Sequence, residues 1–245
     1  MIKLEKTDVF GWEAAIRGLR NPMNSWDMSD SHYGCEEQHC DECTFLNSCR
    51  VDYPHCYYSI GVNDLKLMRC LSRAGDDHGK FLRMINVTVD ITAPLYWWKE
   101  FDTYKVGTVA NSCSTMHKIA DKEFTIDDFS HEHLFVNEEY PLTEVTDDHG
   151  VTAEMQISSV GVLNVLIGFL NHYRKEFIKT KNKLYWWQMI QLLPSSYNQK
   201  RTVQLNYQVL KSMYFARMTH KLDEWRQFCK WCESLPYFRE VVIQE

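Results

Sequence analysis

The sequence predicts a mixed α/β (α+β) fold with a helix-rich C-terminal half and a cysteine-rich insertion. Within residues 81–91, Ile85, Val87, Val89 and Ile91 alternate with polar side chains, which is typical of a strand. Apolar residues recur at helical spacing through about the last hundred residues. Residues 26–59 show neither period and carry five of the nine cysteines. We therefore expect one domain over residues 1–245, with 26–59 as the insertion.

Composition and charge exclude several classes of protein. The 27 Lys and Arg residues against 33 Asp and Glu give a net charge of −6, which argues against an extended nucleic-acid surface. No apolar run reaches the roughly 18 residues that span a bilayer. The segment Met1–Lys6 mixes charges and lacks the apolar stretch of a signal peptide. We expect a soluble, cytoplasmic protein.

The first half of the chain predicts two helices before the strand and one after it. Apolar residues at helical spacing indicate a helix over 10–19, which Asn21-Pro22 ends. A second helix is expected to start with Asn63 or Asp64 as its cap and to run up to Gly75. After the strand, Pro94 suits the first turn of a tryptophan-rich helix.

The second half of the chain predicts a loop, an acidic surface region and a series of helices. Residues 107–117 are small and polar, which favours a loop whose backbone can approach a ligand closely. Residues 121–150 are acidic, and we expect surface structure and turns there. Apolar spacing then predicts helices over 160–177, 185–193, 203–217 and 222–232.

The cysteines of the insertion favour a metal site. Such a polar segment buries little apolar area, so a bound ion would have to hold it in place. Zinc, held by four cysteines or by three and a histidine, is the first candidate, and an iron–sulfur cluster is the second. A reduced loop without a ligand is the third possibility. The expected ligands are Cys35, Cys40, Cys43, Cys49 and Cys56, with the spacing C-x4-C-x2-C-x5-C-x6-C.

The remaining cysteines suggest structural roles. Cys229 and Cys232 are expected on one face of a helix. Cys70 and Cys113 are expected to be small buried residues, which is the usual environment of a free cysteine.

The order of several motifs resembles the flavin-dependent thymidylate synthases. A turn with a glycine and a histidine precedes the strand, and a tryptophan-rich helix and a Ser/Thr/Asn loop follow it. Leu-Pro, an asparagine, an arginine, a histidine and a glutamate then follow in the order and close to the spacing of that family. The residues concerned are Gly75, His78, Leu193, Pro194, Asn206, Arg217, His220 and Glu224.

This resemblance implies that family's fold, a homotetramer, and sites for FAD and a deoxyuridine nucleotide between subunits, with a folate-type carbon donor. In the family the arginine matching Arg217 polarises the pyrimidine, which makes it the candidate catalytic residue. The resemblance further assigns Ser114, Asn111, Ser112 and Lys105 to the nucleotide, and His78, Asn206 and His220 to the flavin.

Several arginines of the family are replaced here. Ser112 stands where the family has glutamate, and Met116, Gln208 and Ile190 stand where it has arginine. Lys105 is the single cation at the position of an Arg-His-Arg segment. Each lost charge-assisted hydrogen bond is worth about 1.5–3 kcal/mol, so an ordinary site of the family would not survive unchanged.

Three functions remain open from the sequence. The first is a divergent flavin-dependent nucleotide methyltransferase, for which a phage or bacterial source would be suitable. The second is a non-catalytic nucleotide-binding or interaction protein on the same fold. The third places the active centre in the cysteine cluster, as a redox site or a zinc recognition module. Without a ligand, Ser114 would be a loop cap, and Arg217 would pair with Asp223 or Glu224.

Overall fold

The computed structural model describes residues 2–33, 58–146 and 152–244. The chain folds into two compact units. The first unit contains Met1–Lys3, Ile91–Thr103 and Asn111–Arg201, and the second contains Leu4–Asp90, Tyr104–Ala110 and Thr202–Glu245. The five cysteines of the predicted metal site lie outside the described residues, namely Cys35, Cys40, Cys43, Cys49 and Cys56.

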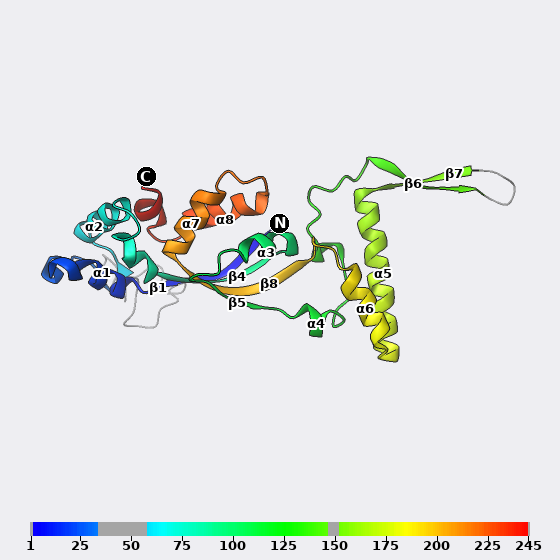
Figure 1. Cartoon of the computed structure of the whole chain (residues 1–245), viewed down its shortest axis with the longest axis horizontal. Helices are drawn as coiled ribbons and strands as arrows, with labels where there is room; N and C mark the ends of the chain where they lie inside the picture. The colour runs from blue at the N-terminus through cyan, green and yellow to red at the C-terminus, as the bar shows by residue number, and fades with distance from the viewer. Residues whose placement is uncertain (1, 34–57, 147–151, 245) are drawn as a thin grey trace, which may run out of the picture. The chain divides into compact units, whose positions relative to one another are not determined.

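A four-stranded sheet has the strand order β1-β4-β8-β5 (Figure 1). The strands are β1 (Lys3–Phe10), β4 (Asn86–Pro94), β8 (Asn198–Asn206) and β5 (Val109–Ser112). The alternating run does form a strand, since Val87, Val89 and Ile91 are all at most 1% exposed. This strand begins at Asn86, later than predicted, because Gly79–Arg83 forms a 3-10 helix instead.

Several strand assignments differ from the sequence prediction, among them β8, β1 and β5. The chain forms β8 where a helix over 203–217 was expected, and only Tyr207–Arg217 is helical. Along β8, buried Val203 and Leu205 alternate with exposed neighbours, which is the two-residue period of a strand. The charged segment β1 was not predicted, and β5 lies in the expected loop. Charged side chains interrupt the apolar pattern of β1, and every residue of β5 is exposed, so neither segment shows the alternation that predicts a strand.

The second unit surrounds an aromatic core. Its helices are α1 (Trp12–Arg20), α2 (Val62–Arg73), α7 (Tyr207–Arg217) and α8 (Asp223–Glu233), and its last turn is Arg239–Ile243. The Tyr207 ring meets Trp12 edge to face at 5.4 Å and Phe238 at 5.5 Å, and its hydroxyl donates to Pro236 O at 2.6 Å. Trp225 and Phe228 of α8 are fully buried. A short ladder, β2 (His32–Tyr33) with β3 (Tyr58–Ser59), completes the unit.

The first unit is built on a helical hairpin. Helices α5 (Ser159–Thr180) and α6 (Lys183–Leu192) lie side by side (Figure 1). Ahead of α5, β6 (Glu139–Thr146) pairs antiparallel with β7 (Thr152–Ser158). The remaining helices are α3 (Leu95–Phe101) and the short α4 (Thr115–Lys118). The core residues packed between these elements are Ile119, Phe124, Phe129, Leu163, Leu170 and Met189.

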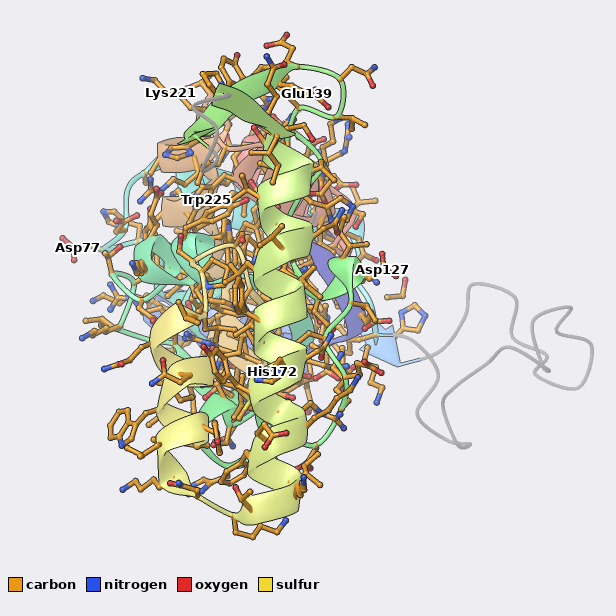
Figure 2. All side chains as sticks on the ribbon, turned by 90° about the vertical axis from the view of Figure 1, so that its right-hand side faces the viewer. Asp77, Asp127, Glu139, His172, Lys221 and Trp225 are labelled. Carbon is orange, nitrogen blue, oxygen red and sulfur yellow. The ribbon has the colours of Figure 1, made fainter. Side chains whose placement is uncertain are left out.

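Helix α5 is apolar well beyond the face that it buries. Only Leu163 and Leu170 of this helix are buried, whereas Val162, Val165 and Phe169 are each half exposed. Figure 2 looks onto α5 and α6, with His172 of α5 labelled. None of the helices in the described part of the chain combines the length and apolarity needed to cross a bilayer.

A buried ion pair organises the start of α2. Arg20 Nε donates to Asp64 Oδ1 at 2.6 Å, and both side chains are at most 4% exposed. Asp64 was predicted as a possible helix cap, but its carboxylate forms the ion pair with Arg20. The cap of α2 is supplied by Asp30, whose carboxylate accepts the N–H of Asn63 at 2.8 Å and of Asp64 at 3.1 Å.

The prediction is confirmed for Cys229 and Cys232 and wrong for Cys70 and Cys113. Cys229 and Cys232 both lie on α8 and are buried. Burial, together with the charge of Glu233, raises the pKa of Cys229 to about 11. Cys70 and Cys113 are exposed, contrary to the prediction, because they occupy the outer side of α2 and the end of β5.

Candidate functional site

The first unit contains a cavity of about 330 Å³ whose lining residues are mostly of polar and charged types. It lies where the turn between β5 and α4 faces the beginning of β8. Its lining residues are Cys113, Ser114, Thr115, Lys118, Asp121, Lys122, Tyr197, Asn198, Gln199 and Lys200. Ser114 is therefore the one predicted nucleotide-binding residue that the structure places in this cavity.

Two hydrogen bonds connect the two sides of the cavity. Cys113 N–H donates to Lys200 O at 2.9 Å, and Gln199 Nε2 donates to Cys113 O at 3.0 Å. Ser114 Oγ accepts the N–H of His117 at 3.1 Å and so caps α4. The predicted role of Ser114 as a cap is thus present, and its hydroxyl still lines the cavity.

Charge makes this cavity suitable for an anion. Three lysines face a single aspartate among the lining residues. Lys118 Nζ lies 2.9 Å from Asp121 Oδ2, and this hydrogen bond and charge raise the pKa of Lys118. Lys122 pairs with Asp128. Ammonium groups of lysine bind phosphate as compact point charges, so the excess of positive charge favours a phosphate or another small anion.

A cation–π contact holds β8 in place at the cavity. The Arg201 guanidinium carbon lies 4.1 Å from the centre of the Trp98 ring, and its Nη1 donates to Asp102 Oδ1 at 2.7 Å. Its Nε donates to Gln199 Oε1 at 3.0 Å, and Trp98 Nε1 donates to Gln199 O at 2.9 Å. The guanidinium of Arg201 is thus engaged in contacts within the fold. The adjacent Lys200 is the cation of β8 that lines the cavity.

Sequence reasoning missed the three cavity lysines and Gln199. The pair Lys200-Arg201, which follows Leu193-Pro194 at the start of a strand, could have indicated Lys200 and Gln199. It was missed because the strand Asn198–Asn206 was not predicted. Asn111 and Ser112, which were predicted to bind the nucleotide, lie exposed on β5 and are not among the lining residues. Lys105 is exposed in the second unit.

The second unit places Arg217 among aromatic rings at the end of α7. Arg217 Nε donates to Tyr104 Oη at 2.9 Å. The guanidinium carbon lies 4.9 Å from the centre of the Trp225 ring and 5.6 Å from that of Tyr104. Asp223, one of its two predicted ion-pair partners, pairs with Arg226. The predicted catalytic residue thus contacts two aromatic rings and a phenol oxygen.

The residues predicted to contact a flavin have other roles in this structure. Asn206 Oδ1 accepts the N–H of Val209 at 3.1 Å, so Asn206 is the cap of α7 and not a residue within a helix as expected. His220 Nδ1 accepts the N–H of Leu222 at 3.2 Å, and its ring lies 6.3 Å from Trp225. His78 is exposed on the turn that follows Gly75.

Metal binding can be judged only over part of the chain. Within residues 2–33, 58–146 and 152–244, no group of three or more His, Cys, Asp or Glu side chains could hold a metal ion. The predicted cysteine ligands fall in the gap between 33 and 58 and are not described.

Solved structures with the same fold are known. No family model matches the sequence, and no curated protein matches it. Thymidylate synthase X (ThyX) from Helicobacter pylori, solved with FAD and dUMP, matches with a TM-score of 0.60 at 14% identity, over 99% of this chain and 97% of that one. The UMP/dUMP methylase PolB from Streptomyces cacaoi, bound with 5-Br dUMP, matches with a TM-score of 0.54 at 14% identity, over 98% and 93%. The chain thus has a ThyX-like fold along nearly its whole length.

Proposed function

We propose that this protein binds a deoxyuridine nucleotide. The observation that carries the proposal is the lysine-lined cavity of the first unit, which offers cations and the Ser114 hydroxyl to a phosphate. Two structural neighbours were solved with dUMP or its 5-bromo analogue, which supports a uridine nucleotide as the ligand class. The likeness concerns the fold, so the ligand has to be tested on this chain.

Arg217 is the proposed residue for the pyrimidine. A guanidinium is planar and donates in a fork, so it can bind a ring carbonyl and stabilise negative charge that develops on the ring. Its position between Tyr104 and Trp225 limits its motion. The cavity lies in the first unit and Arg217 in the second, so each is proposed by itself, and Arg217→Ala should weaken dUMP binding if Arg217 contacts the pyrimidine.

Titration calorimetry with dUMP tests the cavity. Lys200→Ala should weaken binding about 10-fold or more, because a charge-assisted hydrogen bond is worth about 1.5–3 kcal/mol. The matched control is Lys175→Ala. Lys175 is an exposed lysine on α5 of the same unit, and its Nζ lies 3.9 Å from Glu123 Oε1. Equal binding by both variants would remove the cavity from the proposal, and no binding by the unaltered protein would end it.

Methylation of the nucleotide is a second candidate, suggested by the methylase among the structural neighbours. It would need a folate-type carbon donor and, as in the resembling family, a flavin. The neighbour from Helicobacter pylori was solved with FAD, which supports a flavin as the cofactor. Against it, Asn206 and His220 each use one polar atom within the fold, and Gln208 replaces an arginine. An absorbance spectrum of the purified protein tests this candidate, because bound flavin would show its visible bands and their absence would refute it.

We further propose that the protein is a homo-oligomer, the expected tetramer, that contacts its copies through α5. A large exposed apolar surface is normally covered by another protein surface, and the first part of α5, residues 159–173, contains no Asp, Glu, Lys or Arg. The same uncharged face of a second copy would cover it without burying a charge. Light scattering should show Val165→Glu as a smaller species, while Met23→Glu, at an 81% exposed site in the other unit, should not change the size.

A further inference from the structure

Charges of opposite sign are separated along one stretch of the first unit. Residues 123–173 contain ten Asp and Glu residues and no Lys or Arg. The next ten residues, 174–183, contain five Lys and Arg residues and one Glu. Helix α5 spans this change, because its uncharged part, residues 159–173, is followed by basic residues up to its last turn.

The acidic residues Glu138 and Glu139 lie at the start of α5. Glu139 pairs with Ser158 across the β6-β7 ladder. Ser158 directly precedes α5 and caps it by accepting the N–H of Gly161 at 3.1 Å. Figure 2 shows Glu139 labelled at the upper end of α5 and His172 further down the helix. Both glutamates are exposed, so their carboxylates can meet a partner at this end of the helix.

The exposed face of α5 carries basic residues near its other end. Val165, His172, Lys175 and Lys179 are separated by seven, three and four residues, so they share one face of the helix, and all four are exposed. Lys175 Nζ lies 3.9 Å from Glu123 Oε1, but both side chains are exposed, and such a surface pair contributes little. The face is therefore apolar towards its start and positively charged towards its end.

We propose that two copies pack α5 against α5 in opposite directions, so that Glu139 of one copy meets Lys175 of the partner subunit. The inference rests on the homo-oligomer proposed above and adds the direction of packing and the charged contacts. Opposite directions place each acidic end beside a basic end, whereas packing in the same direction would place like charges together, which is destabilising. A two-fold axis between the helices forms each contact twice.

Distances along the helix agree with this contact. Residue 166 is the middle of the uncharged part, residues 159–173. With the two-fold axis there, Ser158, the residue that pairs with Glu139, lies eight residues before the axis, and Lys175 lies nine residues after it. At about 1.5 Å per residue these positions are about 12 and 14 Å from the axis, so they meet across it. Within one copy the same two positions are about 26 Å apart, so Glu139 and Lys175 can pair only between copies.

Charge reversal on each side of the contact tests the inference. In sedimentation velocity over a series of protein concentrations, Glu139→Lys and Lys175→Glu should each associate about 10-fold more weakly, because each variant creates two contacts between like charges. The two changes shift the net charge of the chain in opposite directions, so overall repulsion cannot explain both losses. Lys179→Glu, one turn further along the same face, is a second variant on the basic side. The matched control is Lys66→Glu, at an exposed position of α2 in the other unit, which should associate normally.

Mixing the two variants tests the direction of packing. An equimolar mixture of Glu139→Lys and Lys175→Glu should associate as the unaltered protein does, because a mixed pair has opposite charges at both contacts. The double variant Glu139→Lys/Lys175→Glu should also associate normally. Changes that merely damaged the fold would not be corrected in either case, and circular dichroism of each variant checks the fold directly.

The outcomes separate this inference from the oligomer on which it rests. If each single variant associates as strongly as the unaltered protein, or if the mixture stays weak, the opposite direction of packing is refuted while the oligomer remains. The size of Val165→Glu tests the oligomer by itself. An unaltered protein that stays monomeric at all concentrations would remove the proposed oligomer, and the inference with it.

Discussion

Replacing Asp64 with asparagine tests what holds residues 25–31 in place. Asp64 Oδ2 accepts from the hydroxyls of Ser29 at 2.7 Å and Ser31 at 2.6 Å, and from the backbone N–H of Asp30 and Ser31. Arg20 Nη1 in turn donates to Ser25 O at 3.0 Å. The ion pair and its hydrogen bonds therefore connect α1, α2 and the intervening segment.

The expected loss of stability is large. Removing one partner of a buried ion pair costs about 3–5 kcal/mol, because the other charge stays buried without compensation. Asparagine keeps one carbonyl oxygen and presents an N–H₂ group to donors that need an acceptor. Since domains are stable by only about 5–15 kcal/mol, Asp64→Asn should remove about a fifth or more of the total.

The effect should also depend on pH. Burial alone raises the pKa of Asp64, but hydrogen bonds from Ser31, Ser29 and Arg20 and the charge of Arg20 outweigh it and hold the pKa below its usual 3.8. A carboxylate with a lowered folded-state pKa stabilises the protein fully above the unfolded-state value, and this contribution is lost as the pH falls through the folded-state value. The difference between the two proteins should therefore be constant near neutral pH and shrink below about pH 3.8.

Urea unfolding at pH 7, followed by circular dichroism, measures the difference. With a slope near 3 kcal/mol/M, the midpoint should fall by about 1–2 M. Glu13→Gln is the matched control, because it removes an exposed ion pair with Arg17, at 3.6 Å on the same α1, and should change stability by less than about 1 kcal/mol. A midpoint for Asp64→Asn no lower than that of the control would refute the reasoning.

Three further outcomes are expected. At pH 8, iodoacetamide should label Cys113 in the folded protein much faster than Cys229, since a pKa of about 11 instead of 9.0 leaves about 100-fold less thiolate, and equal rates would contradict the burial of Cys229. Gly107→Ala should lower the melting temperature through its positive φ, whereas Gly168→Ala, where nothing lies within 4 Å in α5, should not, and the reverse order would contradict the left-handed conformation of Gly107. If zinc binds the cysteines between 35 and 56, elemental analysis should find about one zinc per chain, and a chelator should lower stability. A metal-free protein would refute this site.

Strong local patterns were sufficient to predict much of the fold. The β-branched alternation of β4 and the apolar period of α5 were recognisable because burial of one face leaves a regular pattern. Pro94 marked the start of α3 correctly. For β8 the apolar residues Val203 and Leu205 also fit a helical spacing with those of α7, so the change from strand to helix at Asn206 was not visible.

The cavity could be predicted only in part. Ser114 was found through a motif, since its neighbours in sequence carry the resemblance. Lys200 and Gln199 come from a strand far along the chain, and only the pairing of that strand places them beside Cys113. Contacts between distant segments depend on the tertiary fold, and the spacing of residues within one segment does not show which distant segment pairs with it.

The β2-β3 ladder has a consequence for engineering. His32 pairs with Ser59, and Tyr33 pairs with Tyr58, so the chain leaves and returns at neighbouring points. Two antiparallel strands can be joined by a two-residue turn such as Asn-Gly. Exchanging the residues between 33 and 58 for such a turn should therefore keep the pairing of β2 with β3. The resulting protein would lack the five cysteines, and its nucleotide binding can be measured directly.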